Sequence, residues 1–438
     1  MNGKILVKKK IKAFNKIIEI EGDKSLSIRW AILASQANGI STTTNLLKSE
    51  DIISSITCLR KLGVKIRMYK NKCDIIGLGV NGYNYKKNIV LNAGNSGTFA
   101  RLILGVLVHA KHKIKLIGDK SLSKRDFFRI SKPLEKFGAK IKTNNGKLPI
   151  TIKGTDNPNP INYKEVKGSA QCKSAVMLAA LNTKGQTIIK AKKSRNHTEL
   201  LFKHLGLPIK TIRSTNFDII KISGKNKKIN PLNYKIPSDI SSSAFFIVLT
   251  ILTNNSKILI KNVNVNSSRI GLITILKKMG ANIKFEKQKN YKGEKIANIV
   301  IKSPKSLKGI NCPVRLNSGA IDEFLVIFLV AAKAKGISHF KDISELNQKE
   351  SPRLEWGKKI LNNMGIKTIT SNNSIKIFGN PNLKIKKKII IKNYLKDHRV
   401  FMTSVIAGLS FGGNWEIHDK SSIKTSFPNF LKIVNKFK

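Results

Sequence analysis

Cysteine is scarce in this chain of 438 residues, and its four cysteines lie far apart. They are Cys58, Cys73, Cys172 and Cys312. None belongs to a Cys-x-x-Cys pair or lies beside a histidine at the spacing of metal ligands. Structural zinc sites and disulfide frameworks need such clusters, so we expect neither a metal nor a disulfide. This cysteine usage suits a reducing compartment, and we expect the protein to be cytoplasmic.

Long hydrophobic runs are also missing. The first ten residues contain no apolar core region of the kind that a signal peptide has, so we expect no signal peptide. No run of 18 apolar residues occurs, and we expect no membrane span. The chain is nevertheless 41% hydrophobic and long enough for two or three domains with sizeable cores.

Acidic residues are few. Only 25 Asp and Glu accompany 82 Lys and Arg, which gives a formal net charge of +57. Such a charge is typical of proteins that bind nucleic acids or anionic membranes. Here the lysines are spread along the whole chain, and no basic tail, zinc finger or RNA-binding aromatic motif occurs. We interpret the charge as a drift of composition toward Lys, Ile and Asn, and we expect neither a nucleic-acid nor a membrane partner.

A glycine between apolar residues recurs five times, each time after a helix-like apolar stripe and before a strand-like segment. Glycine adopts the left-handed conformation of a helix C-cap at little cost, so each one predicts a helix end. These glycines are Gly63, Gly138, Gly206, Gly280 and Gly365, separated by 75, 68, 74 and 85 residues. A sixth helix is predicted at residues 430–437. The pattern predicts six copies of one α/β unit, three in each of two domains.

Residue patterns inside the repeats predict further elements. Alternating segments predict strands, for example at residues 113–117 and 257–260. Segments rich in Ala, Leu and Ile predict helices, for example at 174–181 and 243–252. The Lys- and Asn-rich stretch 223–234 is the best candidate for a surface connection.

Each repeat opens a helix with a polar cluster. A helix N-terminus offers free backbone N–H groups and a positive dipole end, which together attract anions. Because Ser, Asp and Gly are also ordinary helix caps, one cluster alone predicts only a helix start. Six helix starts that converge would form a cleft for several negative charges. The clusters are residues 22–29, 94–101, 168–173, 237–242, 318–323 and 396–399.

These clusters resemble, in order, the signatures of the enolpyruvyl transferases that act on shikimate 3-phosphate. The resemblance covers nearly the whole chain. Residues 169–173 and 194–199 are similar to the class II branch of that family. The family usually has Asp where this chain has Pro352, and many relatives have Lys where it has Thr425, with Lys424 one place earlier. The similar segments are Gly22–Arg29, Leu91–Thr98, Gly118–Arg125, Gln348–Leu354, Asp397–Arg399 and Thr425–Pro428.

The resemblance implies an α/β fold of two domains, an inside-out α/β barrel. Each domain would contain three βαβαββ-type repeats with helices buried inside. One domain would comprise residues 1–22 and 238–438, and the other residues 23–237, with the active site in the cleft between them. The chain would cross between the domains near Gly22 and Pro237.

The resemblance also implies an addition–elimination reaction without a metal or a cofactor. The 5-hydroxyl of shikimate 3-phosphate attacks C2 of phosphoenolpyruvate, and the tetrahedral intermediate then loses phosphate. The catalytic residues would be Asp322 as the base for the hydroxyl, Glu350 as the group that exchanges the methylene proton, and Lys24. We expect a monomer with these two small-molecule substrates. Glycine at position 97 leaves room for the inhibitor glyphosate, so we also expect sensitivity to it.

Substrate contacts follow from the same resemblance. Three arginines on the phosphoenolpyruvate side suit its carboxylate and phosphate, because guanidinium groups bind both in a bidentate manner. Shikimate 3-phosphate would be held by Lys24, Ser25, Arg29, Ser169, Gln171, Ser194, Arg195, Asp322 and Lys349. Phosphoenolpyruvate would be held by Lys24, Asn95, Gly97, Arg125, Gln171, Arg353, Arg399 and Lys424.

Two alternatives remain open at this point. A transferase that acts on UDP-N-acetylglucosamine shares the fold and the donor but uses a loop cysteine as its acid, and the loop 118–125 contains none. A basic nucleic-acid-binding protein would be retained on DNA at physiological salt with a steep salt dependence.

Overall fold

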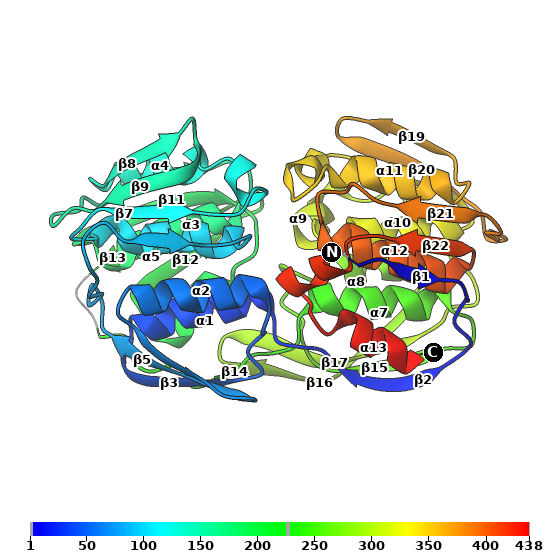
Figure 1. Ribbon diagram of the computed structural model, residues 1–438, viewed down its shortest axis with the longest axis horizontal. Coiled ribbons are helices and arrows are strands. Elements are labelled where there is room, and N and C mark those ends of the chain that lie inside the picture. The colour runs from blue at the N-terminus through cyan, green and yellow to red at the C-terminus, as the bar shows by residue number, and fades with distance from the viewer. Residues whose placement is uncertain (1–2, 225–227, 438) are drawn as a thin grey trace. The chain divides into compact units, whose positions relative to one another are not determined.

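A computed structural model describes residues 3–224 and 228–437 (Figure 1). The chain divides into two compact units, each with its own hydrophobic core. The C-terminal unit comprises Met1–Glu21, Pro237–Lys289 and Lys295–Lys438. The N-terminal unit comprises Gly22–Ile236 and Asn290–Glu294. No sequence pattern indicated that residues 290–294, the tip of a hairpin, would group with the N-terminal unit.

Six sheets share one strand order. In a complete sheet one edge strand is parallel to its neighbour, this neighbour is antiparallel to the third strand, and the third strand forms a hairpin with the other edge strand. In the N-terminal unit the sheets are β14 (Tyr234–Lys235), β3 (Asn38–Thr44), β5 (Lys72–Leu78), β4 (Lys65–Met68); β6 (Val90–Asn92), β7 (Ile114–Ile117), β9 (Lys147–Lys153), β8 (Lys140–Asn144); and β10 (Asn162–Glu165), β11 (Gly185–Lys192), β13 (Phe217–Gly224), β12 (Ile209–Arg213).

The C-terminal unit repeats this order with two shorter sheets. Where the sheet of β18 lacks a regular first strand, isolated parallel bridges join Lys308 to Lys335 and Asn311 to His339. The recurrence of the order confirms the predicted repetition of one α/β unit. The sheets are β2 (Asn15–Glu19), β15 (Lys257–Asn264), β17 (Glu294–Lys302), β16 (Asn282–Tyr291); β18 (Gly336–Phe340), β20 (Ser374–Gly379), β19 (Thr368–Ser371); and β21 (Lys388–Ile391), β22 (Asn414–Ile417), β1 (Ile5–Val7).

Two repeats exchange their first strands. Strand β2 precedes helix α1 (Lys24–Ser35) in the chain but pairs in parallel with β15, with Asn15 opposite Lys257. Strand β14 precedes helix α7 (Ile240–Leu252) but pairs in parallel with β3, with Tyr234 opposite Thr43. The chain therefore passes from one unit to the other after β2 and again after β14.

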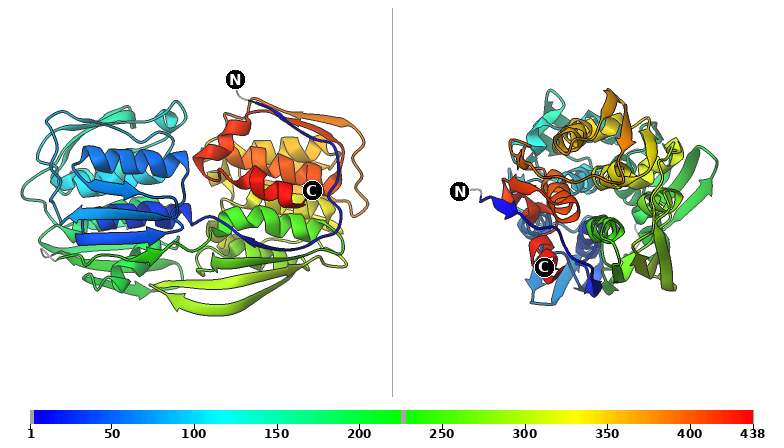
Figure 2. Two further views of the ribbon diagram at one scale, coloured as in Figure 1. Left: turned by 60° about the horizontal axis from the view of Figure 1, so that its bottom comes forward. Right: turned by 90° about the vertical axis from the view of Figure 1, so that its right-hand side faces the viewer.

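Helices form the centre of each unit, and the strands lie outside them (Figure 1; Figure 2, left). In the N-terminal unit α1, α3 (Gly97–Val106) and α5 (Ala170–Leu181) pack together. In the C-terminal unit α7, α10 (Phe324–Lys333) and α12 (His398–Phe411) do so. Every side chain of α5 from Cys172 to Leu181 is buried. A helix buried on all sides is mostly apolar all round, which explains why the Ala-, Leu- and Ile-rich segments are central, and the buried Lys173 of α5 is paired with Glu199 at 2.5 Å.

The remaining helices are shorter or amphipathic. In α2, for example, Ile52, Ile56 and Leu59 are buried, whereas Ile53 is exposed. This spacing places one apolar face against the unit's core. These helices are α2 (Glu50–Lys61), α4 (Phe128–Glu135), α6 (His197–His204), α8 (Gly271–Lys278), α9 (Asn317–Ala320), α11 (Arg353–Asn363) and α13 (Phe430–Val434).

The predicted helix ends are confirmed. All five repeat glycines have positive φ, between 66° and 105°, two or three residues after the last residue of a helix. The predicted elements at 113–117, 257–260, 174–181 and 243–252 correspond to β7, β15, α5 and α7. The predicted final helix is shorter than expected, since α13 ends at Val434 and a 3-10 turn follows to Phe437. The predicted connection 223–234 contains residues 225–227, which lie outside the described residues.

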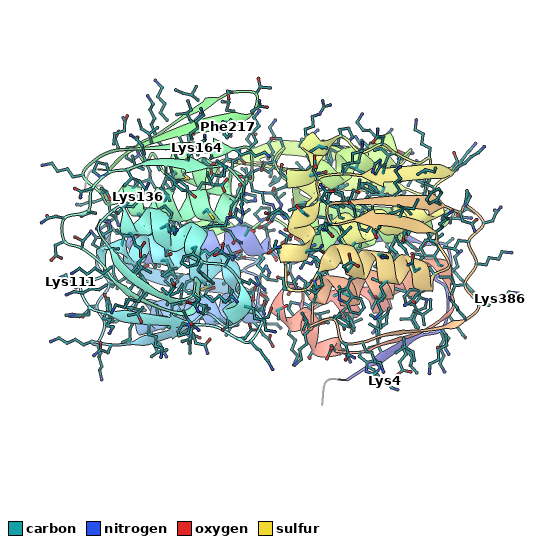
Figure 3. The ribbon with its side chains drawn as sticks, turned by 90° about the horizontal axis from the view of Figure 1, so that it is seen from above. Lys4, Lys111, Lys136, Lys164, Phe217 and Lys386 are labelled. Atoms are coloured by element: carbon teal, nitrogen blue, oxygen red, sulfur yellow. The ribbon has the colours of Figure 1, made fainter. Side chains whose placement is uncertain are left out.

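The surface carries the excess of lysine. Lys111, Lys136 and Lys386 are exposed and project outward from their units (Figure 3). Within residues 3–224 and 228–437, no helix combines the length and the apolar character that crossing a membrane requires.

Candidate active site

Hydrogen bonds join the starts of the three central helices in the N-terminal unit. Arg29 of α1 donates from Nε to Thr198 Oγ1 at 2.8 Å and from a terminal nitrogen to Ser174 Oγ of α5 at 3.3 Å. Arg101 of α3 donates to Gln171 Oε1 of α5 at 2.7 Å. Arg29 and Gln171, two of the predicted substrate ligands, are thus held in fixed positions. Within this unit the starts of the three central helices are therefore linked to one another.

Three guanidinium groups lie near the start of α3. Burial and the like charge of Arg125 lower the pKa of Arg101 to about 10, and Arg129 adds to this effect. Arg129 pairs with Glu165 at 3.4 Å. Cations that repel one another in a partly buried site create a potential that favours a bound anion.

Gly97 provides room for this cluster. A Cβ atom at position 97 would lie 2.9 Å from a terminal nitrogen of Arg125 and 3.2 Å from one of Arg101. Nearby, Arg125 donates to Asn95 Oδ1 at 3.1 Å, and Asn95 donates to Asp119 Oδ2 at 2.7 Å. Glycine at position 97 therefore lets the Arg125 guanidinium lie directly on the helix start.

Lys24 begins α1 and is only partly buried. Its ammonium lies 2.9 Å from Asp51 Oδ2, on helix α2. The side chain of Asp23 caps α1 by accepting from the backbone N–H of Leu26 at 2.9 Å. Lys24 thus combines a fixed position at a helix N-terminus with partial access for a ligand.

The predicted serine ligands differ in their surroundings. Ser169 caps α5, since its Oγ accepts from Cys172 N at 3.2 Å. Ser25 is half-buried, and its carbonyl accepts from Arg29 at 3.0 Å. Ser194 precedes the half-buried Arg195, and its buried hydroxyl forms no hydrogen bond within the part of the chain that the structure describes. A buried hydroxyl of this kind is a candidate ligand contact.

Asp322 lies between two cations in the C-terminal unit. Its carboxylate is 3.4 Å from both Lys349 and Arg353. Its carbonyl accepts from Arg399 of α12 at 2.7 Å. The arrangement gathers Asp322, Lys349, Arg353 and Arg399, all predicted site residues, around the starts of α10, α11 and α12.

Arg353, the first residue of α11, is surrounded by carboxylates and only 2% exposed. It donates from Nε to Asp397 Oδ2 at 2.8 Å and from a terminal nitrogen to Oδ1 at 3.2 Å, and it also binds Glu350. Burial disfavours the charge of Arg353, but Asp397, Glu350 and Asp322 outweigh it and raise its pKa. Burial likewise opposes the charge of Asp397, but Arg353 outweighs it and lowers the pKa of Asp397.

Two positions that depart from the family pattern can now be located. Pro352 occupies the N-cap of α11 with φ −69°, so the helix begins directly at Arg353. Lys424 is exposed near the end of the 3-10 helix Lys420–Thr425, and among the described residues it forms no hydrogen bond or ion pair. Thr425 instead lies beside the Asp-His-Arg segment, 3.3 Å from His398 Nδ1. Within the C-terminal unit, no hydrogen bond or ion pair joins the Lys424 side chain to Asp322, Lys349, Arg353 or Arg399 among the described residues.

Several contacting residues were not predicted from the sequence. Arg101 lies one helical turn after Gly97 on the same helix, and that spacing was an available signal. Asp51 gave no signal, because its partner Lys24 is 27 residues away in the chain. Thr198 lies in the segment 194–199 that resembles the family, but nothing there indicated its bond to Arg29, 169 residues away. Across residues 3–224 and 228–437, no group of three His, Cys, Asp or Glu side chains could hold a metal ion. The clusters of arginine and lysine side chains at the helix starts are suited to anionic ligands.

The chain is similar to a known enzyme family over nearly all its length. The family model for EPSP synthase (3-phosphoshikimate 1-carboxyvinyltransferase) matches residues 8–434. The 3-phosphoshikimate 1-carboxyvinyltransferase of Ruthia magnifica subsp. Calyptogena magnifica is 42% identical over 419 residues, covering 95% of this chain and 94% of that protein. That of Petrotoga mobilis is 37% identical over 428 residues, 97% of each chain. The solved EPSP synthase of Acinetobacter baumannii matches with a TM-score of 0.87 and 34% identity, covering 99% and 98% of the two chains.

Proposed function

The chain belongs to the EPSP synthase (3-phosphoshikimate 1-carboxyvinyltransferase) family, and from this we propose which of its residues carry the reaction. The reaction transfers the enolpyruvyl group of phosphoenolpyruvate to shikimate 3-phosphate and releases phosphate, a step of the shikimate pathway. The matches favour this activity over transfer to UDP-N-acetylglucosamine and over nucleic-acid binding.

Asp322 is the proposed base. The observation that carries this proposal is the position of its carboxylate, 3.4 Å from both Lys349 and Arg353. These two contacts hold the carboxylate at a fixed position beside a proposed ligand of each substrate. Asp322 accepts the proton of the 5-hydroxyl as the oxygen attacks C2 of phosphoenolpyruvate, and gives this proton up to the phosphate that leaves in the elimination step. Lys349, which lies beside Asp322, would bind the same substrate, shikimate 3-phosphate.

Glu350 is the proposed proton donor to the methylene carbon. Addition requires a proton on C3 of phosphoenolpyruvate, and elimination removes one from the resulting methyl group as phosphate leaves. One carboxyl group can act in both directions because it returns to its starting state. Glu350 is partly buried and binds Arg353, so its carboxyl lies next to a proposed ligand of the donor substrate.

Arginine, lysine and polar residues bind the substrate anions in this proposal. In the N-terminal unit Arg125, Asn95, Gly97 and Gln171 bind phosphoenolpyruvate, as do Arg353 and Arg399 of the C-terminal unit. Guanidinium groups suit this role because they form bidentate hydrogen bonds with carboxylate and phosphate. Shikimate 3-phosphate is bound by Ser25, Arg29, Ser169, Ser194 and Arg195, while Lys24 and Gln171 touch both substrates. Lys424 is retained as a candidate that would have to approach on ligand binding.

Release of inorganic phosphate from a mixture of the two substrates tests the proposal. Asp322→Asn keeps the size of the side chain, and loss of a general base lowers kcat by about 100-fold or more. Asp342→Asn is the matched control, because Asp342 is an exposed carboxylate of the same unit with the left-handed φ that Asn tolerates. An Asp322→Asn enzyme that folds and turns over at the wild-type rate would remove Asp322 from this role.

We also propose that the two compact units are two domains and that a single chain in the cytoplasm is the working form. One chain supplies every proposed substrate ligand. All four cysteines are free and buried, and burial raises the pKa of Cys58 to about 12 and of Cys73 and Cys312 to about 11. Such thiols are unreactive and suit a reducing compartment. Sedimentation velocity with and without both substrates would reveal a dimer if one is needed.

A further inference from the structure

A network of buried polar side chains contacts Arg399 in the C-terminal unit. Its central member is Glu323, which directly follows Asp322 and has a side chain only 1% exposed. Glu323 Oε1 is 3.7 Å from a terminal nitrogen of Arg399. The same nitrogen donates to the carbonyl of Asp322 at 2.7 Å. The Glu323 carboxylate and the Asp322 carbonyl thus both hold the Arg399 guanidinium.

Glu323 is itself held by residues from two other elements. Ser241, in the first turn of α7, donates from its hydroxyl to Glu323 Oε1. The Ser241 hydroxyl accepts in turn from Arg269 at 2.6 Å. The same nitrogen of Arg269 lies 3.5 Å from Asp239, the N-cap of α7. The segment before α8 and the starts of α7, α10 and α12 are therefore connected by one network.

The depth of this network argues against direct contact with a substrate. Arg269 is 2% exposed, and Ser241 is also buried. Burial of a charged group is costly unless it is paired, so the contacts of Glu323 with Arg399 and Ser241 restrict the arrangement of these three side chains. The network is therefore suited to fixing the position of the member nearest the helix starts, which is Arg399.

We propose that Glu323 is a positioning residue for Arg399, and that Ser241 and Arg269 hold Glu323 in place for that purpose. This inference rests on the proposed binding of phosphoenolpyruvate by Arg399. A guanidinium fixed before the ligand arrives loses less conformational entropy on binding. The network consequently acts on affinity for phosphoenolpyruvate and leaves that for shikimate 3-phosphate nearly unchanged.

The first test is Glu323→Gln, which removes the charge and keeps the shape. The KM for phosphoenolpyruvate rises about tenfold, the loss expected for one ordered charge-assisted contact, while the KM for shikimate 3-phosphate changes little. Ser241→Ala removes no charge and raises the KM for phosphoenolpyruvate by a smaller factor. Ser243→Ala is the matched control, because the buried Ser243 hydroxyl donates within its own helix, to Asp239 O at 2.8 Å. It leaves both KM values unchanged.

A double-mutant cycle separates positioning from general destabilisation. If Glu323 positions Arg399, Glu323→Gln does not raise the KM for phosphoenolpyruvate further in an enzyme that already carries Arg399→Lys. If Glu323 only stabilises the fold, the effects of the two substitutions on this KM add. Equal effects on both substrates, or additivity in the cycle, overturn the inference. So does an Arg399→Lys enzyme with normal affinity for phosphoenolpyruvate.

Two further measurements keep the test decisive. If Glu323→Gln does not fold, as judged by circular dichroism, Ser241→Ala against Ser243→Ala decides the question. Calorimetric binding of phosphoenolpyruvate, in the presence of shikimate 3-phosphate, is measured beside turnover. A wild-type protein that binds both ligands without turnover would refute the proposed function, and the binding of the variants would still decide the role of Glu323.

Discussion

Replacement of Asp397 by asparagine removes one charge from the most buried ion pair of the C-terminal unit. The side chain of Asp397 is 0% exposed and receives hydrogen bonds from Arg353 through both oxygens, at 2.8 and 3.2 Å. Ser351 donates to the same carboxylate at 2.9 Å. Asparagine keeps the size of the side chain and its ability to cap α12, where Asp397 accepts from Arg399 N at 2.9 Å. The change therefore tests mainly the charge.

The expected loss of stability depends on the contacts that Arg353 keeps in the Asp397→Asn variant. Removing one partner of a buried ion pair costs about 3–5 kcal/mol, because the other charge is left without compensation. Arg353 keeps its contacts with Glu350 and Asp322, so its charge is still compensated. We expect a loss near the lower limit, about 3 kcal/mol in the free energy of unfolding of this unit.

Urea unfolding at several pH values is the assay, with Asp342→Asn as the exposed control. The pKa of Asp397 is lowered in the folded protein, so its contribution to stability is complete above the pKa of an unfolded Asp, about 3.9. The contribution is lost as the pH falls through the folded pKa. The difference between wild type and Asp397→Asn is therefore constant near neutral pH and shrinks in acid. A variant within about 0.5 kcal/mol of wild type at neutral pH would refute the reasoning, since that is the range of neutral surface changes.

Two further predictions concern the N-terminal unit. Gly97→Ala places a Cβ 2.9 Å from a terminal nitrogen of Arg125 and displaces that guanidinium. In steady-state assays the KM for phosphoenolpyruvate rises about tenfold, the loss expected for one charge-assisted hydrogen bond. An unchanged KM would show that Arg125 does not bind phosphoenolpyruvate. Ser194→Ala removes a buried hydroxyl that is unbonded within the described residues. It raises the KM for shikimate 3-phosphate about fivefold, since a neutral hydrogen bond contributes about 1 kcal/mol, and an equal effect on phosphoenolpyruvate would contradict the assignment.

Local sequence determined the repeated elements of this protein. Gly63 and Gly280, for example, have φ of 91° and 98° directly after a helix, a conformation that few other residues adopt at low cost. Polar caps such as Asp23 and Asp239 mark helix starts because they bond to N–H groups only a few residues away. These interactions lie within one turn of the chain, so a sequence pattern records them. The starts that carry the proposed substrate ligands could be predicted for the same reason.

Only the tertiary structure decided which elements meet. Nothing in the pattern of β2 indicates that it pairs with β15, and the adjoining Phe14 N donates to Ser256 Oγ across 242 residues. The same holds for the carboxylates of Asp322 and Asp397 around Arg353, 31 and 44 residues away in the chain, and for the bond between Arg29 and Thr198, 169 residues apart. Such contacts depend on how the central helices pack, and packing is a property of the whole core. The sequence therefore specified the ligand-bearing helix starts, while packing determined their partners, their burial and the pKa shifts that follow.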